Sequence, residues 1–437
     1  MVLLKIKDFI NSDKALKIAD LLLSKYALLL LLLLSFSTIF IFHFHPTYFS
    51  TDASLYAGPS YNFYNSGELL NGPCFLNYYE KTHWQPPLWF VLTGLITSLF
   101  EFSFFSIHIL PLLFYLLFLI LAYYFIPKEH KIAGLCLILS LSAVNAAITN
   151  RPDTLLACLI LIIIFSKNIP LISLMAGIVL YTHTIGIIIF MYAFIKVLLR
   201  KNINEIFIFS VIVIVITLPL LIYILTDFTS YYEQVILNNW VFQGQLSMSG
   251  VIKYLDNIIY FIYLPLLIIL TKIKEIKLET AFLLFLLIFF TFFTFNLYRY
   301  FRYGIVITPF LLFLLDFKED KRIFAFIILL NIILLSYNLV MSVSGLQGDS
   351  VNTCIDNFKK INHEGSICIT ANSFIFQPDS KKCFFDDDCE YFLESESSLL
   401  YYDLTNQSVE KITSICNITR NDGRLSYYIF KKIESNT

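Results

Sequence analysis

The sequence has little charge for its length. Only 14% of its 437 residues are Asp, Glu, Lys or Arg, and 58% are hydrophobic. Soluble globular proteins carry about 25% charged residues, so this shortage excludes an ordinary soluble domain. Long uncharged runs such as Tyr26–Phe44 take the place of the missing charge, and they predict an integral membrane protein. The formal net charge of -1 gives no support to a nucleic-acid partner.

Several motifs of soluble enzymes and metal sites are also missing. The sequence has no Walker motif, dinucleotide-binding glycine fingerprint, HExxH helix or GxSxG elbow, and no pair of its 8 cysteines has the CxxC spacing of zinc sites. It shows no internal repeat, whereas many transporters are built from such repeats. No small-residue cleavage site follows the first apolar run, so residues 26–42 are expected to remain as a first helix and not to act as a signal peptide.

Apolar segments of spanning or near-spanning length recur along the chain. They are expected at residues 26–43, 86–100, 104–126, 132–149, 154–166, 169–184, 185–199, 206–226, 255–271, 279–296, 303–317 and 323–342. Several of them are short for a full span, which favours tilted or broken helices.

Basic residues between these segments occur in clusters, which the positive-inside rule places in the cytoplasm together with the N-terminus. The clusters are Lys128, His130 and Lys131; Lys167; Lys196, Arg200 and Lys201; Lys272, Lys274 and Lys277; and Lys318, Lys321 and Arg322. They share one side only if 86–100 lies in or dips into the outer interface, where Pro86 and Pro87 suit the first turn of a helix. About eleven spans result, with the N-terminus inside and the C-terminus outside.

The composition changes after Gly345. Residues 346–437 are polar and mixed, and the stretches SICITA and LSYYIF are typical of short strands. We therefore expect an all-α polytopic membrane domain at 1–345, with outer juxtamembrane helices in the loop 44–103, followed by a small extracytoplasmic α/β domain. Six cysteines fall on this oxidising side and permit three disulfides in any of fifteen pairings. They are Cys74, Cys354, Cys368, Cys383, Cys389 and Cys416.

The polar stretch 47–90 is the first candidate for chemistry. It begins with a lone acid, Asp52, directly beyond the first helix, where a carboxylate can act as a general base toward a hydroxyl or amine. The alternative role of Asp52 is a helix N-cap. The stretch ends with His83 and Gln85 ahead of two prolines; the alternative there is an interfacial anchor with Trp84 and Trp89 as belt residues.

Two further outer-face turns carry ionisable groups. Arg151 and Asp153 join two apolar segments; they can pair with each other or cap the next helix, or the arginine can hold a phosphate. His183 lies near the outer end of a span, where a structural role is the alternative to a functional one.

The segment 298–303 is unusual because it places Arg299 and Arg302 among four aromatic residues at the outer interface, against the positive-inside bias. Snorkelling arginines in an aromatic belt are one explanation. The other is a clamp in which the cations neutralise a lipid-linked phosphate.

These segments together resemble the GT-C superfamily of polyprenyl-phosphate-sugar glycosyltransferases, in the branch of the protein O-mannosyltransferases and lipid A aminoarabinose transferases. The resemblance covers roughly residues 26–345. The family pattern D-E-x-x-Y-x is matched by Asp52 and Tyr56, with Ala53 for the second acid, and the PPL motif of a juxtamembrane helix by Pro86-Pro87-Leu88 after Gln85. Later motifs are matched by Arg151-Pro152-Asp153, by Tyr181–Gly186 with His183 for a lysine, and by Arg302-Tyr303 with Pro309.

The resemblance implies inverting transfer of a sugar from a polyprenyl-phosphate donor to a lipid, glycan or protein acceptor on the extracytoplasmic face. In this scheme Asp52 deprotonates the acceptor, and Asp153 is a second catalytic candidate. The implied phosphate-binding residues are Arg302, Arg299, Arg151 and His83. The implied pocket residues are Tyr56, Gln85, His183 and Tyr303. Binding of a divalent metal is an alternative role for Asp153 and His183, and no metal or other cofactor is assigned from the sequence.

Two other functions are compatible with the sequence. A transporter or flippase for lipid-linked sugars should carry charged residues near mid-span, whereas here the ionisable groups gather at one face. A non-catalytic membrane scaffold with a cysteine-rich tail is the third hypothesis, because Ala53 and Gln85 depart from the family pattern. The expected location is a plasma or inner membrane, or the endoplasmic reticulum of a eukaryote.

Overall fold

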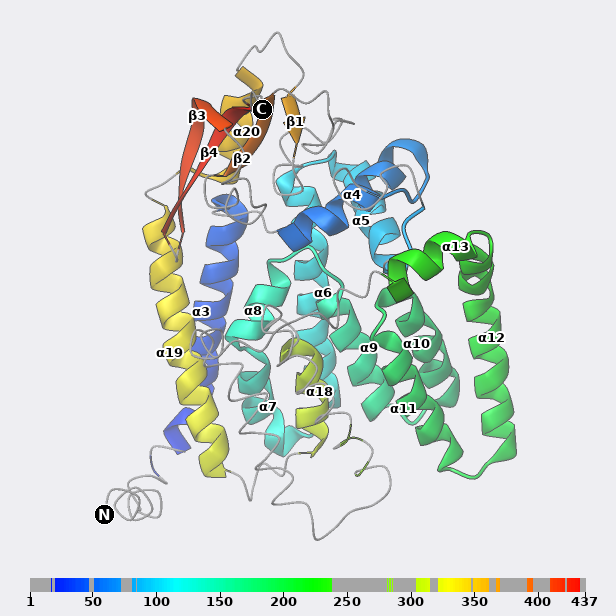
Figure 1. Ribbon diagram of the computed structural model, residues 1–437. Coiled ribbons are helices and arrows are strands. Elements are labelled where there is room, and N and C mark those ends of the chain that lie inside the picture. Colours follow the sequence, from blue (N-terminus) through cyan, green and yellow to red (C-terminus); the bar gives the residue numbers. More distant parts are fainter. Residues whose placement is uncertain are drawn as a thin grey trace. The chain divides into compact units, whose positions relative to one another are not determined.

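The computed structural model describes residues 17, 20–46, 51–71, 81–83, 85–237, 281, 283, 285, 304–314, 321–346, 349–360, 367–369, 391–395, 409–420 and 423–432. These residues are mostly α-helical, and the strands among them lie in the C-terminal part of the chain (Figure 1).

The helices follow the apolar segments of the sequence closely. Their bounds are α3 (Lys25–Phe44), α4 (Thr51–Ser66), α5 (Leu88–Phe100), α6 (Phe104–Phe125), η1 (Lys128–His130), α7 (Lys131–Ile138), α8 (Leu141–Ala147), α9 (Asp153–Phe165), α10 (Ile169–Thr182), α11 (Gly186–Leu198), α12 (Ile203–Leu225), α13 (Phe228–Tyr231), η2 (Tyr232–Leu237), α18 (Gly304–Leu314), α19 (Lys321–Gly345) and α20 (Val351–Lys360).

Among the described residues, 4 helices are long and apolar enough to cross a membrane. They are Lys25–Phe44, Phe104–Phe125, Ile203–Leu225 and Phe324–Ser344. A helix needs about 20 apolar residues to cross a bilayer core, so these helices make the chain an integral membrane protein. Five shorter apolar helices accompany them: α5, α9, α10, α11 and α18. The total of eleven spans stays a prediction, since most of 255–296 lies outside the described residues.

One expected apolar segment is a broken helix. The segment 132–149 is broken into α7 and α8 at Leu139 and Ser140. Leu139 leaves the helical conformation with ψ 64. The hydroxyl of Ser140 then accepts a hydrogen bond from Ala143 N at 3.2 Å, as an N-cap does at the start of a new helix.

Contacts divide the chain into two compact units, which we call unit 1 and unit 2. Unit 1 comprises Met1–Ser37, Pro111–Ala147 and Pro152–Tyr337. Unit 2 comprises Thr38–Leu110, Ile148–Arg151 and Asn338–Thr437.

In unit 1, α9 packs against α10 and α18, and α10 packs against α11 and α12 (Figure 1). Tyr181 of α10 forms hydrogen bonds with the backbone of α12 beside Pro219, the proline inside that helix. The Tyr181 hydroxyl donates to Ile216 O at 2.6 Å and accepts from Leu220 N at 2.9 Å. It therefore stands between the two groups that an unbroken α-helix would join directly, so a side chain of α10 completes the backbone bonding of α12 at the proline.

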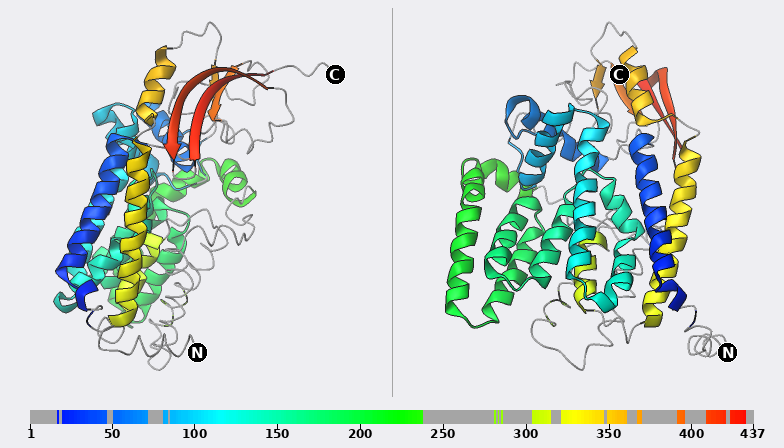
Figure 2. Two further views of the ribbon diagram at one scale, coloured as in Figure 1. Left: turned by 90° about the vertical axis from the view of Figure 1, so that its left-hand side faces the viewer. Right: turned by 180° about the vertical axis from the view of Figure 1, so that it is seen from behind.

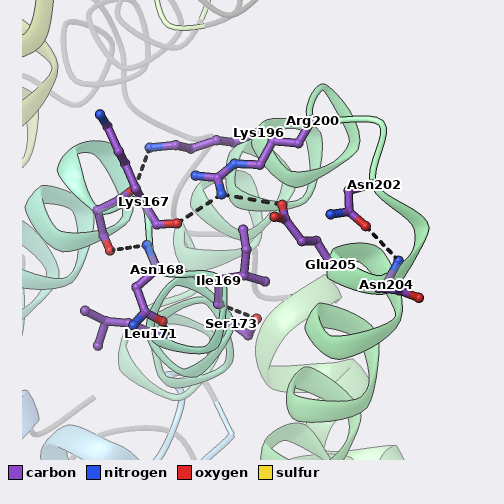
Figure 3. A network of polar contacts seen from close by, with 11 residues as sticks. Lys167, Asn168, Ile169, Leu171, Ser173, Lys196, Arg200, Asn202, Asn204 and Glu205 are labelled. Carbon is purple, nitrogen blue, oxygen red and sulfur yellow. Dashed lines mark hydrogen bonds and ion pairs between the residues drawn. The ribbon is translucent and has the colours of Figure 1, made fainter.

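A network of basic and polar side chains lies at the opposite end of these helices, where α9 and α11 end and α10 and α12 begin (Figure 3). The Lys196 ammonium donates to the carbonyl oxygens of Ile163, Ile164 and Ser166, which end α9. A cation at this place satisfies the carbonyls that a helix C-terminus leaves without partners.

The same network continues into the turns on either side of α10 and α11. Arg200 Nη1 donates to Lys167 O at 3.0 Å and pairs with Glu205 at 3.4 Å. Asn168 caps α10 and Asn202 caps α12, each accepting a backbone N–H bond of 3.1 Å (Figure 3). Two of the basic clusters of the sequence thus lie at one end of this helix group, and their assignment to the cytoplasm stays a prediction.

In unit 2, the last turns of α3 meet the first turns of α6. His43 Nε2 lies 3.4 Å from His108 O. The ring of Phe104 stacks on His108 at 4.0 Å and lies 5.4 Å from the ring of Phe42. The chain on either side of α4 and α5 is therefore held together where it leaves α3 and enters α6.

The C-terminal part of unit 2 contains α20 and a four-stranded sheet. The strands are β1 (Ile367–Ile369), β2 (Tyr391–Ser395), β3 (Val409–Arg420) and β4 (Gly423–Lys432), in the order β1-β2-β4-β3. β1 and β2 are parallel, and the other pairs are antiparallel. The strands expected at SICITA and LSYYIF lie in β1 and β4, and Figure 2 shows β3 and β4 as a long curved hairpin.

α20 packs on β3 with one apolar face. Val351, Cys354 and Phe358 are buried, and Asn357 Nδ2 donates to Ile415 O at 3.3 Å. Cys354 is disulfide-bonded, which agrees with an oxidising environment for this part of the chain. The division into a membrane domain at 1–345 and an extracytoplasmic domain at 346–437 stays a prediction.

Candidate functional site

α4 carries the first candidate residues in unit 2. The helix begins at Thr51, so the backbone of Asp52 lies in its first turn, where a carboxylate is favoured by the helix dipole. The side chain of Asp52 lies outside the described atoms. Tyr56 follows one turn later and is 2% exposed. Positions four apart share one face of a helix, so position 52 lies one turn from Tyr56 on the same face of α4.

α5 is too short to cross a membrane alone. Its 13 residues extend about 20 Å at the helical rise, against about 30 Å of hydrocarbon. This length fits the expectation that 86–100 lies in the outer interface, which stays a prediction. The helix starts directly after Pro86 and Pro87, and Val91 N donates to Pro87 O at 3.1 Å.

α4 and α5 lie against each other (Figure 1), and Gly94 of α5 lies at their contact. A Cβ atom at Gly94 would stand 2.9 Å from Ser60 O and 2.7 Å from Cδ1 of Phe63. Only a glycine lets the two backbones approach this closely without a shift. This contact sets the spacing between Tyr56 of α4 and the first turn of α5.

Trp89, in that first turn, is 0% exposed and its Nε1 donates to Asn150 Oδ1 at 2.9 Å. Asn150 is fully buried as well. The role of an interfacial belt residue, considered for Trp89 from the sequence, is therefore wrong, because a belt indole faces the membrane surface.

Arg151 follows Asn150 in the loop between α8 and α9 and is 5% exposed. Its guanidinium carbon lies 5.5 Å from the ring centroid of Tyr56, within the range of a cation–π interaction. Phe90 lies 5.7 Å from the same ring. Two other segments thus converge on Tyr56 of α4. We call Tyr56, Trp89, Phe90, Asn150 and Arg151 the arginine cluster.

The chemistry of this cluster suits an anion. A guanidinium stays charged and presents a planar fork of N–H donors, which matches phosphate oxygens. Stacking on an aromatic ring fixes the plane of the fork. Burial strengthens each electrostatic contact that Arg151 makes, because the surrounding dielectric is lower than that of water.

His83 and Gln85 are also buried in unit 2, with His83 only 4% exposed. Their segment is fixed by backbone pairing: Leu70 and Lys81 form an antiparallel bridge, and Thr82 N donates to Leu69 O at 2.8 Å. Burial of both side chains agrees better with a place inside the fold than with a surface anchor.

Asn62 of α4 holds the other side of this bridge. Its Nδ2 donates to Leu70 O at 3.1 Å and to Asn71 O at 3.0 Å. One amide group of α4 therefore fixes Leu70 and Asn71, and the bridge from Leu70 to Lys81 links them to the segment that carries His83.

Asp153 and His183 belong to unit 1. Asp153 is fully buried in the first turn of α9, and His183 follows the last residue of α10. α9 and α10 are consecutive packed helices with a short connection, Ser166–Asn168. The start of α9 and the end of α10 therefore lie at the same end of this pair, which brings the two residues to one side of unit 1.

The ring of His183 shapes its own turn. Its Nδ1 accepts a hydrogen bond from Ile185 N at 3.1 Å, and Gly186 N donates to His183 O at 2.7 Å. Nδ1 is therefore the acceptor nitrogen, which leaves the proton of a neutral ring on Nε2. Gly186 is required here, because a Cβ at this position would stand 2.2 Å from Val179 O.

The remaining candidates lie outside the described residues: Arg299, Arg302, Tyr303 and Trp84. The expected arginine clamp thus stays a prediction. Within the part of the chain that the structure describes, no group of three or more His, Cys, Asp or Glu residues could hold a metal ion.

The sequence did not indicate Asn62 or Asn150. Each is a buried or half-buried amide whose partner is identified only by the fold, and Trp89 and Asn150 are 61 positions apart. The available signal was local: Asn150 precedes Arg151, and Trp89 follows the two prolines within the first turn of a helix.

No model of a protein family and no curated protein matches the sequence. Solved structures do share its fold. ArnT from Cupriavidus metallidurans bound to undecaprenyl phosphate aligns with a TM-score of 0.57 and 12% identity, over 94% of this chain and 98% of that chain. ArnT in the apo state aligns with a TM-score of 0.57 and 12% identity, over 92% and 97% of the two chains. The likeness concerns the fold: this chain shares the fold of ArnT over nearly its whole length.

Proposed function

We propose that the protein is an integral membrane glycosyltransferase that moves a sugar from a polyprenyl-phosphate donor to an acceptor on the extracytoplasmic face. The observation that carries the proposal is the buried Arg151, held against Tyr56 of α4 one turn after position 52. The shared fold with ArnT, whose structure contains undecaprenyl phosphate, supports a polyprenyl phosphate as the lipid.

The proposed reaction is a single displacement. An acceptor hydroxyl or amine attacks the anomeric carbon while its proton passes to the carboxylate of Asp52. The bond between the anomeric carbon and the phosphate oxygen breaks, and its electron pair leaves with the polyprenyl phosphate. Attack from the face opposite the leaving group inverts the anomeric configuration.

Arg151 is proposed to bind the phosphate. The phosphate gains negative charge as it leaves, and a fixed guanidinium stabilises that charge more in the transition state than in the ground state. Arg299, Arg302 and His83 are proposed as further phosphate ligands. Gln85, His183 and Tyr303 are proposed to line the pocket, with Asp153 as a second catalytic candidate.

The topology completes the proposal. The N-terminus and the basic clusters face the cytoplasm, while the loop 44–103 and residues 346–437 face the other side. The donor's lipid tail then remains in the membrane while its sugar reaches the outer surface, where Asp52 and the acceptor meet.

The test uses purified full-length protein in lipid nanodiscs with a panel of radiolabelled undecaprenyl- and dolichyl-phosphate sugars and a membrane extract as the source of acceptor. We expect label to move from the lipid to an acceptor with wild type and not with Asp52→Asn. The matched control is Asp356→Asn, which changes an exposed aspartate of another helix in unit 2.

Wild-type rates of transfer in Asp52→Asn would refute the assigned base. Movement of intact donor across the membrane of sealed proteoliposomes that contain the same protein, without transfer of its sugar, would instead support a flippase and contradict the proposed reaction.

A further inference from the structure

The hydrogen bond between Trp89 and Asn150 fixes the loop that carries Arg151. Asn150 and Arg151 lie between α8 and α9 and belong to neither helix. Outside a helical ladder, side-chain hydrogen bonds to the chain contribute to the position of such a loop. One side-chain bond to this loop comes from the indole of Trp89, at 2.9 Å and fully buried.

The chemistry of the two groups fixes their orientation. An indole N–H can only donate, so the group that faces it must be the amide oxygen of Asn150. The amide plane of Asn150 is therefore set, with Nδ2 turned away from the indole. Since Asn150 directly precedes Arg151, the start of the Arg151 side chain is set as well.

The anchor itself is rigid. Trp89 lies in the first turn of α5, where Pro86 and Pro87 restrict the backbone that leads into the helix. The neighbouring Phe90 contacts Tyr56, the ring on which the guanidinium lies. α5 therefore restrains Arg151 in two places. Trp89 restrains its backbone through Asn150, and Phe90 restrains its guanidinium through the ring of Tyr56.

We propose that Trp89 and Asn150 are positioning residues that hold Arg151 in the geometry needed to bind the phosphate of the lipid donor. The inference rests on the proposed function, since it takes Arg151 as a phosphate ligand. Neither Trp89 nor Asn150 touches the phosphate in this scheme; they act only through the position of Arg151.

The experiment measures the affinity of full-length protein in nanodiscs for undecaprenyl phosphate, together with thermal stability. Trp89→Phe keeps an aromatic ring and deletes the N–H donor; Asn150→Leu keeps a similar size and deletes the acceptor. Tyr115→Phe is the control, because it removes a polar atom from another fully buried aromatic ring, one whose hydroxyl has no hydrogen-bond partner among the described residues.

We expect Trp89→Phe and Asn150→Leu each to weaken binding about tenfold, which corresponds to about 1.4 kcal/mol. Tyr115→Phe should bind like wild type. In an Arg151→Gln background, Trp89→Phe should have no further effect, because residues that act through one group are not additive.

The double variant Trp89→Phe/Asn150→Leu separates positioning from simple stability. Each single variant leaves one buried polar group without its partner, whereas the double variant removes both and should regain most of the lost stability. A positioning role predicts that the double variant is stable and still binds weakly. Recovery of both stability and binding would show that the bond serves the fold alone and would overturn the inference.

Different variants test the proposed phosphate site and the proposed positioning role. If wild type does not bind undecaprenyl phosphate, or if Arg151→Gln binds it equally well, the proposed phosphate site is wrong and the inference is overturned with it. If Arg151→Gln binds weakly but Trp89→Phe binds like wild type, or weakens binding further in the Arg151→Gln background, only the positioning role is overturned.

Discussion

The ring of Tyr56 offers the sharpest single-residue test of the arginine cluster. Two substitutions separate the role of the ring from that of the hydroxyl: Tyr56→Phe keeps the ring and removes the hydroxyl, whereas Tyr56→Leu removes both. Since the guanidinium of Arg151 lies 5.5 Å from the ring centroid, the face of the ring is expected to matter and the hydroxyl is not.

The size of the effect follows from burial. Arg151 is 5% exposed and Tyr56 is 2% exposed, so their contact is almost free of water. A desolvated cation–π contact contributes up to about 2 kcal/mol, against about 0.5–1 kcal/mol at an exposed site. Loss of about 1–2 kcal/mol weakens binding about 5- to 30-fold. Tyr56→Leu should show this loss in affinity for undecaprenyl phosphate, and Tyr56→Phe should stay within about twofold of wild type.

The assay is a titration of undecaprenyl phosphate into each variant in nanodiscs, with thermal unfolding measured on the same samples. Tyr56→Leu also loses its ring contact with Phe90, worth about 0.5–1.5 kcal/mol of stability, so binding is compared at a temperature where all variants are folded. Equal affinities of Tyr56→Leu and wild type would refute the cation–π argument. A loss in Tyr56→Phe as large as that in Tyr56→Leu would show that the hydroxyl carries the effect.

Two further predictions concern the helices around the site. Gly94→Ala should lower the free energy of unfolding by about 1–3 kcal/mol, because the new Cβ meets the backbone of Ser60. Thermal unfolding measures the loss, with Ser98→Ala at an exposed position of the same helix as the control. Equal stability of the two variants would contradict the prediction. Tyr181→Phe loses two hydrogen bonds to α12 and should cost about 1–3 kcal/mol, at about 0.5–1.5 kcal/mol each. Hydrogen exchange at the amide of Leu220 should become faster, and unchanged exchange would exclude a role for the hydroxyl.

The positions of most helices could be predicted from the sequence, because long apolar runs between polar turns leave few alternatives. α9 begins at Asp153 and α12 ends at Leu225, each one residue from the expected end of the apolar segment. The break between α7 and α8 could not be predicted in this way, since Leu139 and Ser140 lie inside a continuous apolar run. A serine that caps a new helix and a serine that stays within a helix look the same in sequence.

The candidate site was predicted only in part. Arg151 and Tyr56 were both singled out, but their contact joins a loop to a helix that is far away in sequence. The belt role was considered for Trp89 because an indole beside two prolines fits an interfacial belt as well as a buried anchor. The choice depends on whether a partner for its N–H lies within the fold, and that partner, Asn150, carries no motif of its own.

The most direct test of the whole account is a structure of the protein with undecaprenyl phosphate bound, determined by cryo-electron microscopy in nanodiscs. The measured quantity is the distance between the phosphate oxygens and the guanidinium of Arg151. The account predicts hydrogen-bond contact between them, at about 3 Å, with the carboxylate of Asp52 close to the bound phosphate. A phosphate bound elsewhere, with Arg151 beyond the reach of a salt bridge of about 4 Å, would contradict the central claim.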